Sequence, residues 1–364
     1  MVAKILTTTV SAPGFMGLNT QDSSVSLEAG YATVANNCVI DKFGRIGARK
    51  GWLPKHSTNA DLSTANVKAI GELIGNDGTS YIIAAGNNCI FKLSGSTLTK
   101  LTYGGGGSAP TITADHWQLG PLNGVLYLYQ EGHDPLVFDP AVSTATFKRV
   151  SEKTGYLGTI VQNNCVISAY GRTWSANSAS DKNTIQFSDL LAGHVLTTGT
   201  AGTLNVSQIW PYGADEITAL AAHNHQLFIF GRRQILIYTG AEDPSTMRLY
   251  DTISGIGCCA RDSVALTGSA VFFLSDSGVR SLMRTIQEKS APMRDISANV
   301  RDDLVLEISS ETAADIKAVY SDKEAFYLLS LPARQLVYCF DMRAPLQNGS
   351  NRVTTWDGLV PTAF

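Results

Sequence analysis

Two histidines, His223 and His225, are separated by one residue and form an H-x-H pair of the kind that can bind a metal ion. In an extended segment both side chains point to the same side, as two ligands of one zinc ion must. Zinc needs a third and usually a fourth ligand, and the soft donors nearest in sequence are Cys258 and Cys259. Because adjacent residues of a strand face opposite sides of a sheet, these cysteines are poorly placed to bind one ion together. We therefore predict that the histidine pair lies at a strand edge and is not a metal site.

Other candidate motifs also lack the context that their chemistry requires. The sequence contains no G-x-S-x-G and no H-E-x-x-H motif. The adjacent carboxylates of Asp302 and Asp303 would diverge on a helix, whereas the two carboxylates of a glycosidase flank the substrate. Gly255, Gly257 and Ala260 have the spacing of a dinucleotide-binding loop, but strand-like residues follow where that loop requires a helix. The sequence therefore predicts no catalytic residues, no cofactor and no metal.

The residues that follow the histidine pair have the pattern of a β-hairpin. Two apolar runs, 227–230 and 234–238, flank a turn made of Gly231, Arg232 and Arg233. Such a turn is usually a charged hairpin tip in solvent, and its two arginines are also suited to contact phosphate. Arg232 and Arg233 are accordingly the candidate DNA-facing residues of this chain.

The same hairpin pattern recurs along the chain. Further copies begin at the following positions: Ser80, Gly124, Asn164, Ala270 and Ala325. Their spacing of roughly 40 to 60 residues is the period of propeller blades with four strands each. Many of the strands are apolar on both faces, as a blade between two neighbouring blades must be. We predict an all-β fold, a β-propeller-like array of about six hairpin-based blades over residues 61–364.

Helical patterning is confined to one short stretch, residues 295–304. Ile296, Val300 and Leu304 recur every fourth residue, and Asp295 precedes them as a candidate N-cap. Residues 1–60 show no sustained strand or helix period, so we predict an irregular N-terminal segment. Its apolar residues Phe15, Met16 and Leu18 cannot bury themselves locally, and we expect them at a subunit interface or in a strap over the chain's own blades.

Composition limits the classes of partner. With 28 lysines and arginines against 31 aspartates and glutamates, the net charge is −3, which provides no global basic field for nucleic acid or an anionic membrane. The six cysteines are sparse for 364 residues and include no C-x-x-C pair, so reduced thiols are expected. The N-terminal residues do not resemble a secretory signal, and no apolar run is long enough for a membrane span. These features predict a soluble protein made in a reducing cytoplasm.

Residues 13–52 carry a resemblance to a known family. The pattern consists of Gly17-Leu18-Asn19-Thr20, Leu27 to Gly30, Asn36-Asn37 and the basic stretch Gly47 to Trp52. It resembles the opening of the tail tube or nozzle proteins of short-tailed, podovirus-like double-stranded DNA bacteriophages. A second stretch, from Gly255 to Leu304, is similar to the later blades of the same proteins.

The resemblance implies a structural virion protein of the phage tail, made in the host bacterial cytoplasm and without enzymatic activity. Its family forms a β-propeller that assembles as a hexameric ring and continues the DNA ejection channel. The implied partners are further copies of the chain, the adaptor, fibre or distal tail proteins, and double-stranded DNA in transit. Two alternatives stay open, a carbohydrate-binding or glycan-cleaving propeller enzyme and a propeller scaffold that binds a protein partner.

Overall fold

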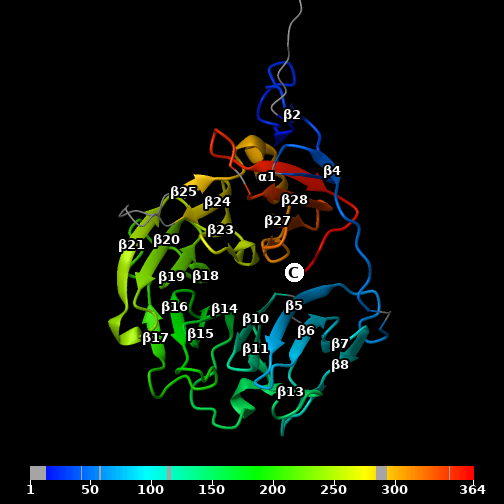
Figure 1. The fold of residues 1–364 in the computed structure, drawn as a ribbon. Helices are drawn as coiled ribbons and strands as arrows, with labels where there is room; N and C mark the ends of the chain where they lie inside the picture. The colour runs from blue at the N-terminus through cyan, green and yellow to red at the C-terminus, as the bar shows by residue number, and fades with distance from the viewer. Residues whose placement is uncertain (1–13, 42, 57–58, 113–115, 284–292, 344) are drawn as a thin grey trace, which may run out of the picture.

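The computed structural model describes residues 14–41, 43–56, 59–112, 116–283, 293–343 and 345–364. Its sheets stand side by side around a central axis, with the chain running from blade to blade in sequence order (Figure 1). This is a six-bladed β-propeller, which confirms the predicted fold class. Among the described residues no helix has the length and the apolar character needed to cross a bilayer.

Each blade is built from consecutive strands, and five of the six blade sheets have four strands. Blade 1 comprises β5 (Val67–Ile74), β6 (Ser80–Gly86), β7 (Cys89–Ser94) and β8 (Thr97–Lys100). Blade 2 comprises β10 (Trp117–Leu122), β11 (Val125–Gln130), β12 (Leu136–Phe138) and β13 (Thr146–Arg149), with β9 (Thr102–Tyr103) as a fifth, outer strand; η1 (Val150–Glu152) follows. Blade 3 comprises β14 (Asn163–Ala169), β15 (Arg172–Ser178), β16 (Thr184–Phe187) and β17 (Gly202–Asn205).

The second half of the chain repeats this order. Blade 4 comprises β18 (Ile217–His223), β19 (Gln226–Gly231), β20 (Gln234–Thr239) and β21 (Arg248–Ser254), with η2 (Pro244–Thr246) before the last strand. Blade 5 comprises β22 (Ala265–Leu266), β23 (Ala270–Ser275), β24 (Gly278–Met283) and β25 (Met293–Asp295), and η3 (Arg261–Ser263) precedes it. Blade 6 comprises β26 (Lys317–Ser321), β27 (Phe326–Leu331), β28 (Leu336–Asp341) and β29 (Arg352–Trp356).

The six hairpins predicted from the sequence each lie in a different blade. The hairpin of residues 227–238 is β19 paired with β20, in antiparallel register with Phe228 opposite Ile237. Its two faces meet different neighbours, because Leu227 and Ile229 pack in a cluster with blade 3 whereas Phe228 and Phe230 pack with blade 5. All four side chains are buried, so the prediction of a blade covered on both faces is confirmed.

Hydrophobic clusters join the blades in order but do not close the ring. Five clusters of described residues connect blades 1 and 2, 2 and 3, 3 and 4, 4 and 5, and 5 and 6. The remaining cluster combines Leu62 with blade 1 alone, so no cluster of described residues joins blades 6 and 1. We call this junction the seam. Figure 1 shows the C-terminal residues running into it.

Polar contacts bridge the seam instead. Lys68 of β5 forms an ion pair with Asp315, just before β26, with 3.6 Å between Nζ and Oδ1. The C-terminal residues connect both blades, because Ser330 Oγ donates to the carbonyl oxygen of Pro361 at 2.6 Å and Thr362 Oγ1 donates to that of Val67 at 2.7 Å. The seam is therefore held by a few polar interactions rather than by an apolar core.

The N-terminal segment packs on the outer edge of blade 6. It contains four short strands, β1 (Gly17–Leu18), β2 (Tyr31–Ala32), β3 (Cys38–Ile40) and β4 (Ile46–Ala48), and is otherwise irregular, as predicted. Asn36 forms a parallel bridge with Thr355 of β29, which extends the blade outward. Residues 1–13, 42 and 57–58 of the predicted segment lie outside the described residues.

The short helix begins later than the sequence indicated. The helix α1 covers Arg301–Ile308 after a 3-10 turn, η4 (Ala298–Val300), so the predicted start at Asp295 is wrong. Asp295 is the last residue of β25, and its carboxylate accepts a hydrogen bond from the Ser297 amide at 3.0 Å, which forms a turn instead of a helix cap. The apolar pattern itself is correct, because Ile296, Val300 and Leu304 are all buried.

Candidate functional site

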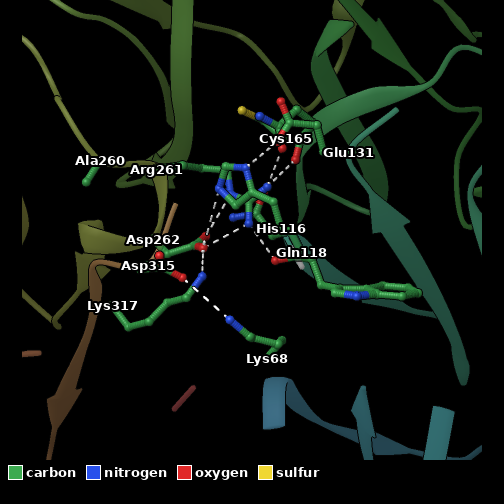
Figure 2. A network of polar contacts seen from close by, with 12 residues as sticks. Lys68, His116, Gln118, Glu131, Cys165, Ala260, Arg261, Asp262, Asp315 and Lys317 are labelled. Atoms are coloured by element: carbon green, nitrogen blue, oxygen red, sulfur yellow. Dashed lines mark hydrogen bonds and ion pairs between the residues drawn. The ribbon is translucent and has the colours of Figure 1, made fainter. Parts of the chain in front are cut away.

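A single buried arginine connects three blades at the propeller axis. Arg261 stands in η3 at the entry to blade 5, and Figure 2 shows its side chain directed into a network of polar groups. Its Nη1 donates to the carbonyl oxygen and Oδ1 of Asn164 in blade 3, at 2.5 and 2.6 Å. Its Nη2 donates to the carbonyl oxygen of Trp117 in blade 2 at 2.5 Å. Because blades 2 and 5 lie across the ring from each other, the guanidinium reaches across its centre.

The charge of Arg261 is balanced by the neighbouring carboxylate. Asp262 accepts two hydrogen bonds from Arg261, 2.7 Å from Nε and 2.8 Å from Nη2, and also pairs with Lys317 Nζ of blade 6. Burial alone would raise the pKa of Asp262, but the adjacent Arg261 and Lys317 cations outweigh it and hold that pKa at about 2. Asp262 is thus ionised at neutral pH and ties blades 5 and 6 to the arginine.

A histidine and a glutamate extend the network toward blade 2. His116 Nδ1 lies 2.8 Å from Glu131 Oε2, and His116 Nε2 lies 3.9 Å from Asp262 Oδ2 (Figure 2). Burial and the nearby Arg261 charge lower the pKa of His116. A neutral imidazole is therefore favoured beside the arginine, and His116 can act there as a hydrogen-bonding group rather than as a further cation.

A cavity of about 750 Å³ adjoins this network, between the inner strands of the blades. Its wall is formed mainly by the innermost strands of the blades, β5, β10, β14, β18 and β26, together with η3 and the C-terminal residues. Arg261, Asp262 and Lys317 belong to its lining. We call it the axial cavity, and its size is that of a small-ligand pocket.

The two histidines of the H-x-H pair have different surroundings. His223 ends β18 and lines the axial cavity, whereas His225 occupies the turn to β19 with φ 61° and bonds Glu242, with 2.6 Å between Nδ1 and Oε1. Within the parts of the chain that the structure describes, no group of three or more histidine, cysteine or acidic side chains could hold a metal ion. Cys258 is buried, and burial raises the pKa of its thiol to about 11.

The other residues singled out from the sequence lie on two different blades. Leu18 is buried on blade 6 of its own chain, while Phe15 and Met16 beside it are half-buried. The Arg232–Arg233 turn is exposed at the end of blade 4, where both backbone amides donate to the Asp215 carboxylate and the Arg232 guanidinium bonds Asp276 at 3.0 Å. A role of either group at an interface or near DNA stays a prediction.

Sequence reasoning did not find the axial network. Arg261 and Asp262 follow the two cysteines as an ordinary Arg-Asp pair, and nothing in their local pattern marks them as buried. Only the stacking of blades brings them to Trp117, Asn164 and Lys317, which lie far away in the sequence.

Comparisons with known proteins support the fold but do not show a family to which the chain belongs. No family model and no curated protein matches the sequence. Among solved structures, the chain resembles hydrazine synthase of Kuenenia stuttgartiensis, with a TM-score of 0.51, 12% identity, and 86% of this chain and 92% of that chain covered. YCF48 from Cyanidioschyzon merolae gives a TM-score of 0.47 at 9% identity, covering 84% and 88% of the two chains.

A third structure, PorZ of the type-IX secretion system of Porphyromonas gingivalis, gives a TM-score of 0.43 at 12% identity. The match covers 82% of this chain and 33% of PorZ, so the chain spans about a third of that protein. At 12% identity, the likeness to hydrazine synthase shows a shared fold alone, and a shared fold does not transfer function.

Proposed function

We propose that the protein is a structural protomer of the tail nozzle ring of a short-tailed double-stranded DNA bacteriophage. The proposal begins from the resemblance of residues 13–52 to the opening of those proteins. In this reading the propeller is a rigid body and the N-terminal segment supplies contacts between copies. Catalysis is not part of the proposed role.

The observation that carries the proposal is the concentration of exposed apolar side chains on the N-terminal segment. Val25 and Leu53 are 94% and 90% exposed, and Val34, Ile46 and Trp52 are also exposed. Large apolar groups gathered on one segment of the surface are typical of a protein-binding site. An interface with another copy of the chain would remove them from water.

The hairpin of β3 and β4 offers hydrogen bonds to the same partner. All three residues of β4 are exposed, and Gly47 is paired with Val39 of β3. In an antiparallel pair the backbone groups of a strand point alternately to its two sides, so those of Ile46 and Ala48 face away from β3. An open strand edge beside exposed apolar groups is suited to pairing with a neighbouring subunit.

The axial network constrains where DNA would pass. Because Arg261 spans the propeller axis, a duplex cannot run through one protomer, and a channel would have to lie between several copies arranged in a ring. The net charge of −3 suits such a conduit, since every neutralised phosphate adds affinity and slows passage. The Arg232–Arg233 turn is partly neutralised by Asp215 and Asp276, which would weaken any phosphate contact there.

The rival reading of a glycan-cleaving enzyme has less support. A glycosidase needs one protonated carboxylic acid and one carboxylate on either side of the bond that it cleaves. The axial cavity is lined by Glu72 and Asp262, and Asp262 is held ionised by Arg261 and Lys317. It is therefore unsuited to donate a proton at neutral pH.

Mass photometry of the purified full chain, followed by electron microscopy of the particles, tests the proposal. We expect a six-fold ring in which the N-terminal segment lies between protomers. Leu53→Asp should dissociate the ring without lowering the melting temperature of the monomer, because the side chain is exposed. Ser96→Asp, in the loop between β7 and β8, is the matched control and should leave the ring intact.

A strict monomer at concentrations where tail proteins assemble would contradict the proposal. Glycan hydrolysis by that monomer would favour the enzyme, and retention of one defined host protein would favour the scaffold. Leu18→Ala separates folding from assembly, because loss of a buried leucine lowers the stability of the monomer itself by about 2 to 5 kcal/mol.

A further inference from the structure

The outermost strand of blade 4, β21, exposes apolar side chains. Leu249 and Tyr250 are 41% and 51% exposed. On the outermost strands of the other blades, no large apolar side chain that the structure describes is exposed. Neighbouring apolar groups that remain in water on one strand are typical of a protein-binding surface. Blade 4 therefore has a feature at its outer edge that the other blades lack.

A β-bulge interrupts this strand at Tyr250. Leu249 lies opposite Tyr238 of β20, and the next paired residue is Asp251, so Tyr250 has no counterpart on β20. Bulges at a sheet edge re-aim side chains and are built features of a fold rather than defects. The outer edge of β21 pairs with no other strand of the described chain. The strand thus offers an exposed tyrosine beside an open edge.

A groove continues this surface at the C-terminal end of β21. It has a volume of about 790 Å³, and its lining includes Ser254, which is the last residue of the strand, and the exposed Tyr212. The carboxylates of Asp215 and Glu216 and the Arg232–Arg233 turn also belong to its lining. The groove has room for a large side chain of a partner protein.

The charges of this surface are opposite to those of the N-terminal segment. Residues 41–56 contain five basic residues and one acidic residue, whereas residues 242–251 contain three acidic residues and one basic residue. Arg45 and Lys50 are exposed in the first range, and Glu242 and Asp243 are exposed in the second. Surfaces of opposite charge attract each other and fix the orientation in which they dock. The N-terminal segment therefore fits this surface by charge as well as by its apolar groups.

The positions of the two surfaces on the propeller suit a ring of six copies. The N-terminal segment lies on blade 6, which is separated from blade 4 by blade 5 (Figure 1). Neighbouring blades of a six-bladed ring are about 60° apart, so the outer edges of blades 4 and 6 face directions about 120° apart. In a head-to-tail ring of six, each protomer fills a sector of about 60°, and its two contact faces also point about 120° apart. Blade 5 would then face the channel.

We propose that β21 and the groove at its end form the surface on which the N-terminal segment of a second copy of this chain docks. The inference rests on the proposed nozzle ring and names the face of the protomer that receives the segment. Leu249 and Tyr250 would cover the exposed Trp52 and Leu53 of the next copy. Because the two surfaces of this contact differ, it can repeat from copy to copy until the ring closes.

Tyr250→Asp tests the receiving surface. A charge at this position should prevent ring formation, while the melting temperature of the monomer stays unchanged because the side chain is exposed. Leu249→Asp is a second variant with the same expected result. Val142→Asp is the matched control and should leave the ring intact. Val142 is an exposed apolar residue of blade 2, which is also two blades away from blade 6, on the other side of it.

A mixture of two variants distinguishes this contact from one between identical surfaces. Leu53→Asp copies keep an intact β21, and Tyr250→Asp copies keep an intact N-terminal segment. Each variant alone should be monomeric, and the mixture should form one-to-one heterodimers that do not grow further. Analytical ultracentrifugation of the full chains measures these species.

Two results would overturn the inference alone. One is a ring that Tyr250→Asp and Leu249→Asp leave intact, which would keep the nozzle proposal and move the receiving surface to another blade. The other is a mixture that stays monomeric although the unaltered chain forms a ring. A monomeric unaltered chain would overturn both proposals. A closed ring of another copy number that Tyr250→Asp abolishes would support the contact and contradict the six-fold nozzle.

Discussion

The guanidinium of Arg261, which belongs to the entry of blade 5, donates to the carbonyl oxygen of Trp117 in blade 2 at 2.5 Å. One side chain therefore connects two blades that are not neighbours in the ring. With its bonds to Asn164 and Asp262, Arg261 satisfies carbonyl, amide and carboxylate oxygens that meet at the axis. It acts as a central anchor that fixes the distances between the inner strands.

Replacing Arg261 by methionine should lower the free energy of unfolding by about 3 to 5 kcal/mol, because the change leaves Asp262 buried with a single cation and orphans two backbone carbonyls. Chemical denaturation measures the loss. Arg232→Met, which removes an exposed arginine from the ion pair with Asp276, should change stability by less than about 1 kcal/mol. Equal effects of the two substitutions would refute the central role of Arg261.

The stability of the propeller should fall in acid between about pH 4 and pH 2. The pKa of Asp262 is about 2 in the fold and near 3.8 when unfolded, so its contribution is fully present above pH 4 and is lost as the pH falls through the folded pKa. The contribution is of the order of 2 kcal/mol. The measurement compares unfolding free energies at pH 5 and pH 3.

Asp262→Asn is the control for this pH dependence. The variant is less stable at every pH, because Arg261 and Lys317 lose their shared anion, but its stability should change less between pH 5 and pH 3 than that of the unaltered protein. If both proteins lose the same amount of stability over this range, other carboxylates account for the acid sensitivity.

Phe230→Ala should lower the free energy of unfolding by about 3 to 5 kcal/mol. Phe230 is fully buried between blades 4 and 5, with its ring centroid 5.0 Å from that of Phe273. A double-mutant cycle with Phe273→Ala should yield a coupling of about 0.5 to 1.5 kcal/mol. Leu249→Ala, at a partly exposed position of β21, serves as the reference and should cost only about 0.5 kcal/mol. An equally small effect of Phe230→Ala would mean that blades 4 and 5 are not packed as described.

The blades could be predicted from the sequence because each hairpin is specified by residues that are close together in the chain. A strand such as 227–230, apolar on both faces and followed by a charged turn, specifies both a hairpin and two neighbours that cover it. The axial site depends on contacts between residues that are distant in sequence, such as Arg261 with Trp117 and Asn164. No period or spacing of residues in the sequence indicates those contacts. The error at Asp295 has a local cause, since an aspartate before an apolar pattern can form a turn as readily as a helix cap.

The seam between blades 6 and 1 should be the part of the ring that opens most readily. On β5, Ile70 and Ile74 are 40% and 63% exposed, whereas β14 of blade 3 packs against a hydrophobic cluster on each side. Local opening needs less free energy where few apolar contacts are broken. Hydrogen exchange followed by mass spectrometry should therefore show faster exchange for residues 67–74 than for residues 163–169 of β14.

Removal of residues 361–364 should increase this difference. The truncation deletes the hydrogen bonds from Ser330 to Pro361 and from Thr362 to Val67, a loss of roughly 2 kcal/mol at the seam. Exchange in residues 67–74 should become faster, while β18, which lies between two packed neighbours, should keep its rate. If β5 and β14 exchange equally slowly in both proteins, the seam is closed as tightly as the other junctions, and the polar bridge from Lys68 to Asp315 suffices to hold it.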